Sequence, residues 1–294
     1  MIPYAFEYAS PSSLSEAIGL LKSKGEGAKV LAGGQSLIPL LKLRLASPTV
    51  LIDINRIEGL GYIREEGGFL KIGALVRMAE VEASDLLRRK YPVIHDASGV
   101  IADPLVRNLG TVGGNLSHAD PANDLPAVML ALGGKFVAKG PSGDRVIAAE
   151  TFFVDSFTTE LNHDEILTEV RVPTPGPRSG GAYLKHEQKV ADFATAAVAV
   201  QLTVAPRGEI QSVGIGLTAV GSTAIKAKDA EHSLIGKKVS DVQAIGAAAK
   251  LAAEASDPAS DIRGTAGYKK DVIRLLLARA LQKASERARS RGGA

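Results

Sequence analysis

Apolar residues near the start of the chain recur at helical spacing. Leu14, Ala17 and Leu21 lie three and four positions apart, as on one face of an amphipathic helix. Ser13 directly precedes this pattern, and Glu16 lies three positions after Ser13, which is the spacing of a capping box. The pattern therefore predicts a helix that begins at residue 14.

Short apolar runs and helical patterns then alternate up to about residue 176. Apolar runs bounded by glycine or polar residues are typical of buried strands, whereas longer periodic stretches are typical of helices. The stretch 100–115 is rich in Gly, Asp, Asn and Pro, and we expect a structured loop there. We expect strands at 30–32, 50–54, 69–73, 135–138, 145–147 and 165–172, and helices at 36–44, 78–87, 93–97 and 124–132.

The character of the chain changes after its densest Pro/Gly stretch, residues 173–181. Three apolar runs follow and predict a three-stranded antiparallel sheet, after which two helices are expected. The sequence therefore predicts an α+β fold with a larger domain at 1–176 and a smaller one at 177–294. The three strands are expected at 183–187, 196–205 and 210–220, and the helices at 241–255 and 268–289.

Composition excludes several classes of protein. The 294 residues include no cysteine, which excludes disulfides, thiolate-bound zinc and an iron–sulfur cluster held by this chain alone. With no tryptophan and 4% aromatic residues, the chain has little material for nucleic-acid stacking, and its net charge is only +3. No apolar run approaches the roughly 18 residues of a membrane span, and no signal peptide is visible. We expect a cytoplasmic protein without an integral membrane segment.

Two segments with paired glycines carry the main chemical signal. The segments 32–36 (Ala-Gly-Gly-Gln-Ser) and 111–115 (Thr-Val-Gly-Gly-Asn) each combine a glycine pair with hydrogen-bonding side chains. Glycine pairs can direct successive backbone N–H groups into one concavity that binds anionic oxygens, although a plain turn is the ordinary alternative. Neither segment matches the G-x-G-x-x-G or P-loop pattern. Together they indicate a diphosphate site, provided that they meet in space.

The chain resembles a known family in the runs 30–39, 107–115 and 120–126. These runs are similar to those of the FAD-binding medium subunit of molybdenum hydroxylases, the xanthine dehydrogenase family, and most similar to its aerobic carbon monoxide dehydrogenase branch. The resemblance implies an FAD domain of the vanillyl-alcohol-oxidase/PCMH type, built of two α+β subdomains. It also implies cofactor contacts from Ala32, Gly33, Gly34, Gln35, Ser36, Leu37, Gly110, Thr111, Gly113, Gly114, Asn115, Asp124, Leu167, Lys185 and Phe193.

Some of these residues have alternative interpretations or depart from the family pattern. Asp124 could simply be a charge at a helix start, Lys185 a solvated side chain, and Phe193 an ordinary core residue. Gln35 stands where the carbon monoxide enzymes commonly carry histidine, so hydrogen bonding is retained and titration is lost. Phe193 stands where the family has tyrosine, so the ring is retained without its hydroxyl.

The resemblance implies an electron-transfer role without catalytic or metal-binding residues in this chain. FAD would collect electrons from the [2Fe–2S] clusters of a small subunit, and a large subunit would hold the molybdenum cofactor, in a dimer of heterotrimers. The alternatives are a self-contained PCMH-type flavin oxidoreductase that acts on its own substrate, or a scaffold that has lost FAD. The substrate of the large subunit and the terminal acceptor stay open.

Overall fold

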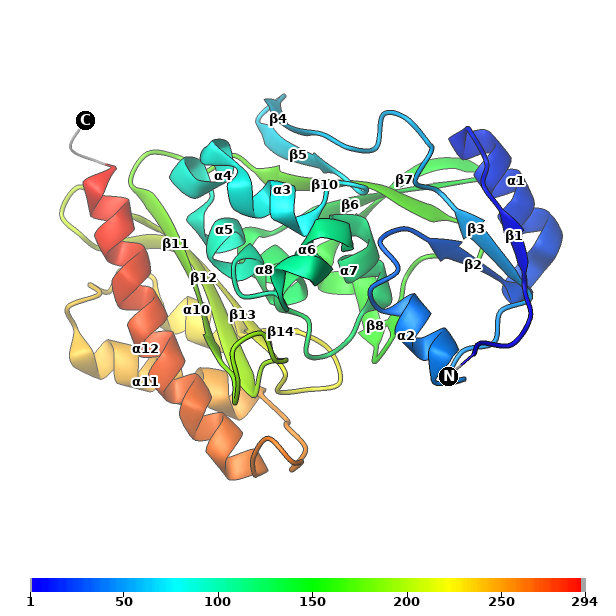
Figure 1. Cartoon of the computed structure of the whole chain (residues 1–294). Coiled ribbons are helices and arrows are strands. Elements are labelled where there is room, and N and C mark those ends of the chain that lie inside the picture. Colours follow the sequence, from blue (N-terminus) through cyan, green and yellow to red (C-terminus); the bar gives the residue numbers. More distant parts are fainter. Residues whose placement is uncertain (1, 292–294) are drawn as a thin grey trace.

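A three-stranded parallel sheet forms one end of the molecule (Figure 1). The structure, a computed structural model, describes residues 2–291. The middle strand is the apolar run around residue 51, which is buried because it has a neighbour on both sides. The strands lie in the order β1 (Glu7–Ala9), β3 (Val50–Asp53) and β2 (Ala28–Leu31).

Helix α1 (Leu14–Lys24) begins where the capping signal predicted. The Ser13 hydroxyl accepts a hydrogen bond from the Glu16 backbone N–H. The Glu16 carboxylate accepts from the Ser12 N–H, so the reciprocal bond lies one residue earlier than in a standard capping box. The short 3₁₀ helix η1 (Gly25–Gly27) then leads into β2.

A five-stranded antiparallel sheet forms the centre of the molecule, and seven short helices lie between its strands in sequence. Its order is β4 (Ile63–Glu66), β5 (Phe69–Gly73), β10 (Ile166–Pro173), β6 (Lys135–Gly140) and β7 (Gly143–Ala148). The helices are α3 (Met78–Ala83), α4 (Asp85–Lys90), α5 (Pro92–Ser98), α6 (Pro104–Leu109), α7 (Val112–His118), α8 (Asp124–Leu132) and α9 (Ala149–Phe152), followed by the hairpin β8 (Phe153–Asp155) and β9 (Thr158–Thr159).

A second antiparallel sheet follows and is covered by helices on both faces (Figure 1). The long terminal helix packs on one face, and α5 and α8 pack on the other. The contact with α8 is close: a Cβ on Gly216 would lie 1.9 Å from the Ala127 carbonyl oxygen. The elements are β11 (Ser179–His186), β12 (Ala196–Val204), β13 (Ile210–Thr218), β14 (Ile225–Lys226), α10 (Lys228–Leu234), α11 (Val242–Ala255) and α12 (Ala266–Ser290).

The hydrophobic core continues across the predicted domain boundary. Tyr183, Ala197 and Ala199 from the second part belong to the same buried cluster as Phe136 and Val170 from the first. The division at residue 176 stays a prediction. Within residues 2–291, no helix is both long and apolar enough to cross a bilayer.

The structure corrects several predicted elements. The expected loop at 100–115 is wrong, because α6 and most of α7 fall there. Both helices are only six or seven residues long and begin at a capped residue, so caps and packing stabilise them more than periodicity does. The three expected strands of the second sheet are present, but β14 adds a fourth. The helix expected at 78–87 is divided at Ser84, whose hydroxyl caps α4.

Candidate functional site

The first glycine segment connects β2 to helix α2 (Leu37–Lys42) by a turn that requires glycine. Gly34 has φ +73°, a conformation that side chains rarely adopt. Among the described residues, no hydrogen bond is donated by the backbone N–H groups of residues 33–36. The Gln35 side chain folds back and donates from Nε2 to the Gly33 carbonyl at 3.1 Å. Ser36 occupies the N-cap position, but its side chain makes no capping bond. This loop therefore presents a row of free donors.

The two glycine segments meet in space. A Cβ on Gly33 would lie 2.2 Å from the Leu109 carbonyl oxygen and 2.8 Å from the Gly110 Cα. A Cβ on Gly114 would lie 4.0 Å from the Ala32 Cβ. Only a hydrogen fits at Gly33, so this residue lets the backbone of one segment approach the backbone of the other.

The second glycine segment is a capped helix start and does not form the expected nest. The Thr111 hydroxyl accepts from the Gly114 N–H at 3.0 Å, and the Gly113 N–H donates to the Ala74 carbonyl at 2.8 Å. Their N–H groups are therefore already engaged within the chain. A Cβ on Gly113 would lie 2.6 Å from the Ala74 Cβ, so this glycine serves the close packing of α7 on the end of β5.

Asn115 leaves a buried polar atom without a partner. Its Oδ1 has no hydrogen bond, whereas its backbone carbonyl accepts from Asn123 Nδ2 at 2.8 Å. Buried amide groups in folded proteins are nearly always hydrogen-bonded, so an orphan of this kind indicates a missing polar partner. The side-chain amide can turn to offer either oxygen or nitrogen, and the nitrogen suits an anionic oxygen. The site therefore fits a diphosphate here.

Two residues that the sequence did not single out connect the glycine segments. Arg77 donates from Nη2 to Asn55 Oδ1 at 2.7 Å and from Nη1 to the Leu109 carbonyl. Asn55 Nδ2 in turn donates to the Ala32 carbonyl at 2.8 Å. Neither residue lies in a glycine motif, and no local pattern marks either one.

A buried charged cluster lies where α8 meets β11. The Asp124 carboxylate accepts from the Tyr183 hydroxyl at 2.5 Å and from Lys185 Nζ at 3.3 Å. Lys185 also donates to the Val100 carbonyl at 2.9 Å and lies 3.4 Å from Glu187. Burial raises the pKa of Asp124 to about 6, although the Lys185 charge acts in the opposite direction.

This cluster bears on the alternatives for two predicted site residues, whose contacts to the cofactor stay predictions. The Lys185 side chain is only 3% exposed, so it is not a solvated surface lysine. Asp124 is the first residue of α8, as the alternative supposed, but it is buried and makes specific contacts to the other sheet. Burial of an ion pair costs free energy, so a gain in stability does not explain the position of this pair.

The two remaining predicted residues lie in different surroundings. Leu167 is buried on β10 in the central core. Phe193 is 49% exposed on the segment between β11 and β12, which contradicts its interpretation as a core residue. Arg263 lies 5.8 Å over the Phe193 ring and donates to Asp192 at 2.9 Å.

Most of the predicted site is connected by contacts. The glycine segments touch each other, and α7 leads from Thr111 to Asn115, which is hydrogen-bonded to the residue before Asp124. Asp124 then contacts Lys185. Leu167 shares the buried central core with Val112 of the second glycine segment, whereas no hydrogen bond within residues 2–291 joins Phe193 to either segment.

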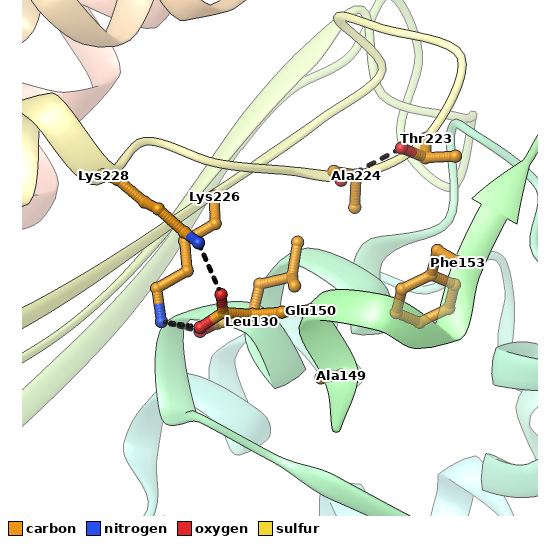
Figure 2. A pocket seen from close by; sticks show the side chains of 8 residues that line it. All are labelled: Leu130, Ala149, Glu150, Phe153, Thr223, Ala224, Lys226 and Lys228. Carbon is orange, nitrogen blue, oxygen red and sulfur yellow. Dashed lines mark hydrogen bonds and ion pairs between the residues drawn. The ribbon is translucent and has the colours of Figure 1, made fainter. Parts of the chain in front are cut away.

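A separate cavity of about 220 Å³ lies between α9 and the segment before α10 (Figure 2). In it Lys226 and Lys228 both pair with Glu150, at 2.9 and 2.8 Å. None of the predicted site residues lines this cavity. Its ion pairs connect the two parts of the chain.

Comparison with known proteins identifies the class of this flavoprotein. Residues 4–175 match the family described as "FAD binding domain in molybdopterin dehydrogenase", and residues 181–284 match "CO dehydrogenase flavoprotein C-terminal domain". The chain is an FAD-binding subunit of an oxidoreductase. It belongs to the molybdopterin dehydrogenase FAD-binding family, which confirms the resemblance.

Relatives in this family match the whole length of the chain. The carbon monoxide dehydrogenase medium chain of Afipia carboxidovorans is 42% identical over 290 residues, covering 99% of this chain and 100% of that protein. Subunit alpha of the 6-hydroxypseudooxynicotine dehydrogenase complex of Paenarthrobacter nicotinovorans is 38% identical over 289 residues, covering 98% and 97%. The structure of reconstituted CO dehydrogenase from Oligotropha carboxidovorans matches with a TM-score of 0.95 at 42% identity, covering 98% and 100%.

Proposed function

We propose that this chain is the electron-transfer flavoprotein subunit of a molybdenum hydroxylase complex. In this proposal a small subunit with [2Fe–2S] clusters delivers electrons, and a large subunit holds the molybdenum cofactor and the substrate. Bound FAD supplies the capacity to collect two electrons and release them to a terminal acceptor. The complex would be a dimer of heterotrimers in the cytoplasm.

We further propose that the FAD diphosphate is held where the two glycine segments meet. The free N–H groups of residues 33–36 would donate to its oxygens, and the Asn115 amide would supply a further donor. The buried pair of Asp124 and Lys185 would contact the cofactor beyond α7. Leu167 and Phe193 complete the proposed contacts, together with Ala32, Leu37, Gly110, Thr111, Gly113 and Gly114.

The contact between Gly33 and the Leu109–Gly110 backbone carries this proposal. A diphosphate needs several donors that converge, and this contact brings together two segments about 75 residues apart in sequence. The relatives support the electron-transfer role. Two proteins whose names refer to carbon monoxide and to 6-hydroxypseudooxynicotine match this chain from end to end. Such a shared framework is expected if the substrate is recognised by another subunit.

Co-expression tests the role in a complex. The chain would be produced with candidate [2Fe–2S] and molybdenum-cofactor subunits, and the flavin absorbance followed near 450 nm. We expect an equimolar complex in which an oxidisable substrate bleaches the flavin only when all three subunits are present. Full turnover of an organic substrate by this chain alone would instead favour a self-contained flavin oxidoreductase. A colourless chain that cannot be reconstituted with FAD would refute both functions.

A further inference from the structure

Arg77 and Asn55 form one hydrogen-bonded unit between the glycine segments. Arg77 can only donate, so the Asn55 side chain must present Oδ1 to it. This orientation directs Asn55 Nδ2 at the Ala32 carbonyl, 2.8 Å away, and at Asp53 Oδ1, 2.6 Å away. The second arm of the guanidinium donates to the Leu109 carbonyl. The unit thus reaches the backbone on both sides of the contact at Gly33.

The rest of the surroundings hold this unit in place. The Arg77 backbone N–H donates to the Glu80 carboxylate at 2.7 Å, which fixes the residue at the start of α3. Asp53 accepts from the Asn55 backbone N–H at 2.9 Å and from the Tyr8 hydroxyl at 2.6 Å. Asn55 therefore has its side-chain donors and its acceptor engaged, and it cannot turn without losing a bond.

We propose that Arg77 and Asn55 are positioning residues that hold the two glycine segments together as one preformed FAD diphosphate site. This inference rests on the proposed location of the cofactor. The two carbonyl groups that accept hydrogen bonds from the unit lie next to the contact between the segments. Ala32 precedes Gly33 on one side of this contact, and Leu109 precedes Gly110 on the other. The second segment is also held by the bond from the Gly113 N–H to Ala74, so loss of the unit mainly frees the first segment. The cofactor would then have to order that segment on binding, which weakens its affinity even though neither side chain is a required phosphate ligand.

Substitutions at Arg77 can separate the effect of the shape of its side chain from the effect of its charge. A guanidinium can reach two acceptors with its planar fork, whereas the lysine ammonium is a single point charge. Arg77→Lys keeps the positive charge near the diphosphate and removes the double contact. Asn55→Ala keeps Arg77 and its bond to the Leu109 carbonyl, but removes the Asn55 bonds to Arg77, to Asp53 and to the Ala32 carbonyl of the first segment. If the pair works as a unit, either change releases the same restraint.

Binding of FAD to the full-length apo chain tests the inference. FAD dissociation constants would be measured by flavin fluorescence, with ADP as a competitor that carries the diphosphate without the flavin. We expect Arg77→Lys and Asn55→Ala each to weaken FAD and ADP binding about 10- to 100-fold. The double variant should lose no more than the weaker-binding single variant, because coupled residues are not additive. Arg88→Lys, at an exposed arginine whose ion pair within residues 2–291 is with Asp85, is the matched control and should bind FAD normally.

Each result decides between the inference and the proposed site. Unchanged binding in Asn55→Ala and Arg77→Lys overturns the inference, as does a double variant whose losses multiply. Weaker FAD binding with unchanged ADP binding also overturns it. Thermal unfolding of each apo variant excludes misfolding, and Asn55→Ala serves if the arginine variant does not fold. Gly33→Ala separates the two failures: normal FAD binding in this variant refutes the proposed site itself, whereas a loss there with none at Arg77 refutes only the role of the unit.

Discussion

Asp124 should make the stability of this chain depend on pH in a direction unusual for a carboxylate with a lysine partner. Burial raises its pKa from the ordinary 3.8 to about 6 in the folded state. The folded protein therefore binds a proton at Asp124 more tightly than the unfolded chain does. The contribution to stability is fully present below pH 3.8 and is lost as pH rises through 6.

The size of this effect follows from the pKa difference. A change from 3.8 to about 6 corresponds to about 3 kcal/mol of unfolding free energy, lost between pH 4 and pH 7. Asp124→Asn removes the charge and keeps an acceptor for the Tyr183 hydroxyl. Lys185 still has Glu187 at 3.4 Å, so the substitution does not leave the lysine without an acidic neighbour. The variant should gain stability relative to the wild type as pH rises.

Urea unfolding of the apo protein at pH 4, 5, 6 and 7 measures this difference. We expect the unfolding free energy of Asp124→Asn, relative to that of the wild type, to rise by about 3 kcal/mol from pH 4 to pH 7. Glu231 is also buried with a raised pKa, but it is present in both proteins and cancels in the comparison. Asp144→Asn, at an exposed ion pair with Lys139, is the control and should follow the wild-type profile. Parallel profiles for wild type and Asp124→Asn would refute the reasoning.

Three further predictions concern the site and the contact between the two parts. Gly33→Ala should weaken FAD binding about 5- to 100-fold in fluorescence titrations, because its methyl group cannot fit; Gly61→Ala, where nothing lies within 4 Å, should bind normally, and equal affinities would contradict the prediction. Arg287→Met should lower the unfolding free energy by about 1–3 kcal/mol, since it removes the 2.6 Å pair to Asp96. Burial acts to raise the pKa of Asp96, but Arg287, Lys283 and the Tyr183 backbone N–H together lower it, so this loss should shrink as pH falls below 4, and a loss independent of pH would exclude the ion pair as its cause. Phe193→Ala should change thermal stability little, because the ring is half exposed, but should alter the fluorescence of bound FAD; an unchanged spectrum would place the ring away from the flavin.

The sequence predicted those elements whose burial shows in a local pattern. The run 50–54 is continuous and apolar because β3 is the central strand of a parallel sheet. The strand β4, in contrast, has three exposed polar residues out of four, and no periodicity marks it. The helices α6 and α7 were not predicted, because they are too short to show a periodic apolar pattern and are marked only by their caps, Asp103 and Thr111. In α7 the two glycines also argue against a helix. Elements held by caps and tertiary contacts are therefore the ones that pattern analysis misses.

The same distinction applies to the candidate site. Gly33, Gly34 and Asn115 belong to short motifs, so their chemistry could be expected from residue types alone. Arg77 and Asn55 act through bonds to carbonyl groups 32 and 23 positions away, and such bonds leave no trace in the neighbouring sequence.

The two glycine pairs look alike in sequence but have different structural roles. Gly34 lies in the left-handed region and turns the first segment so that its N–H groups stay free. Gly113 is inside a helix, with its N–H bonded to Ala74, and its missing side chain lets α7 pack against β5. Free backbone N–H donors therefore come mainly from the first segment, and the second segment provides the rigid backbone that the first segment contacts. A substitution at Gly113 should accordingly lower the stability of the fold along with FAD affinity, whereas one at Gly33 should act mainly on affinity.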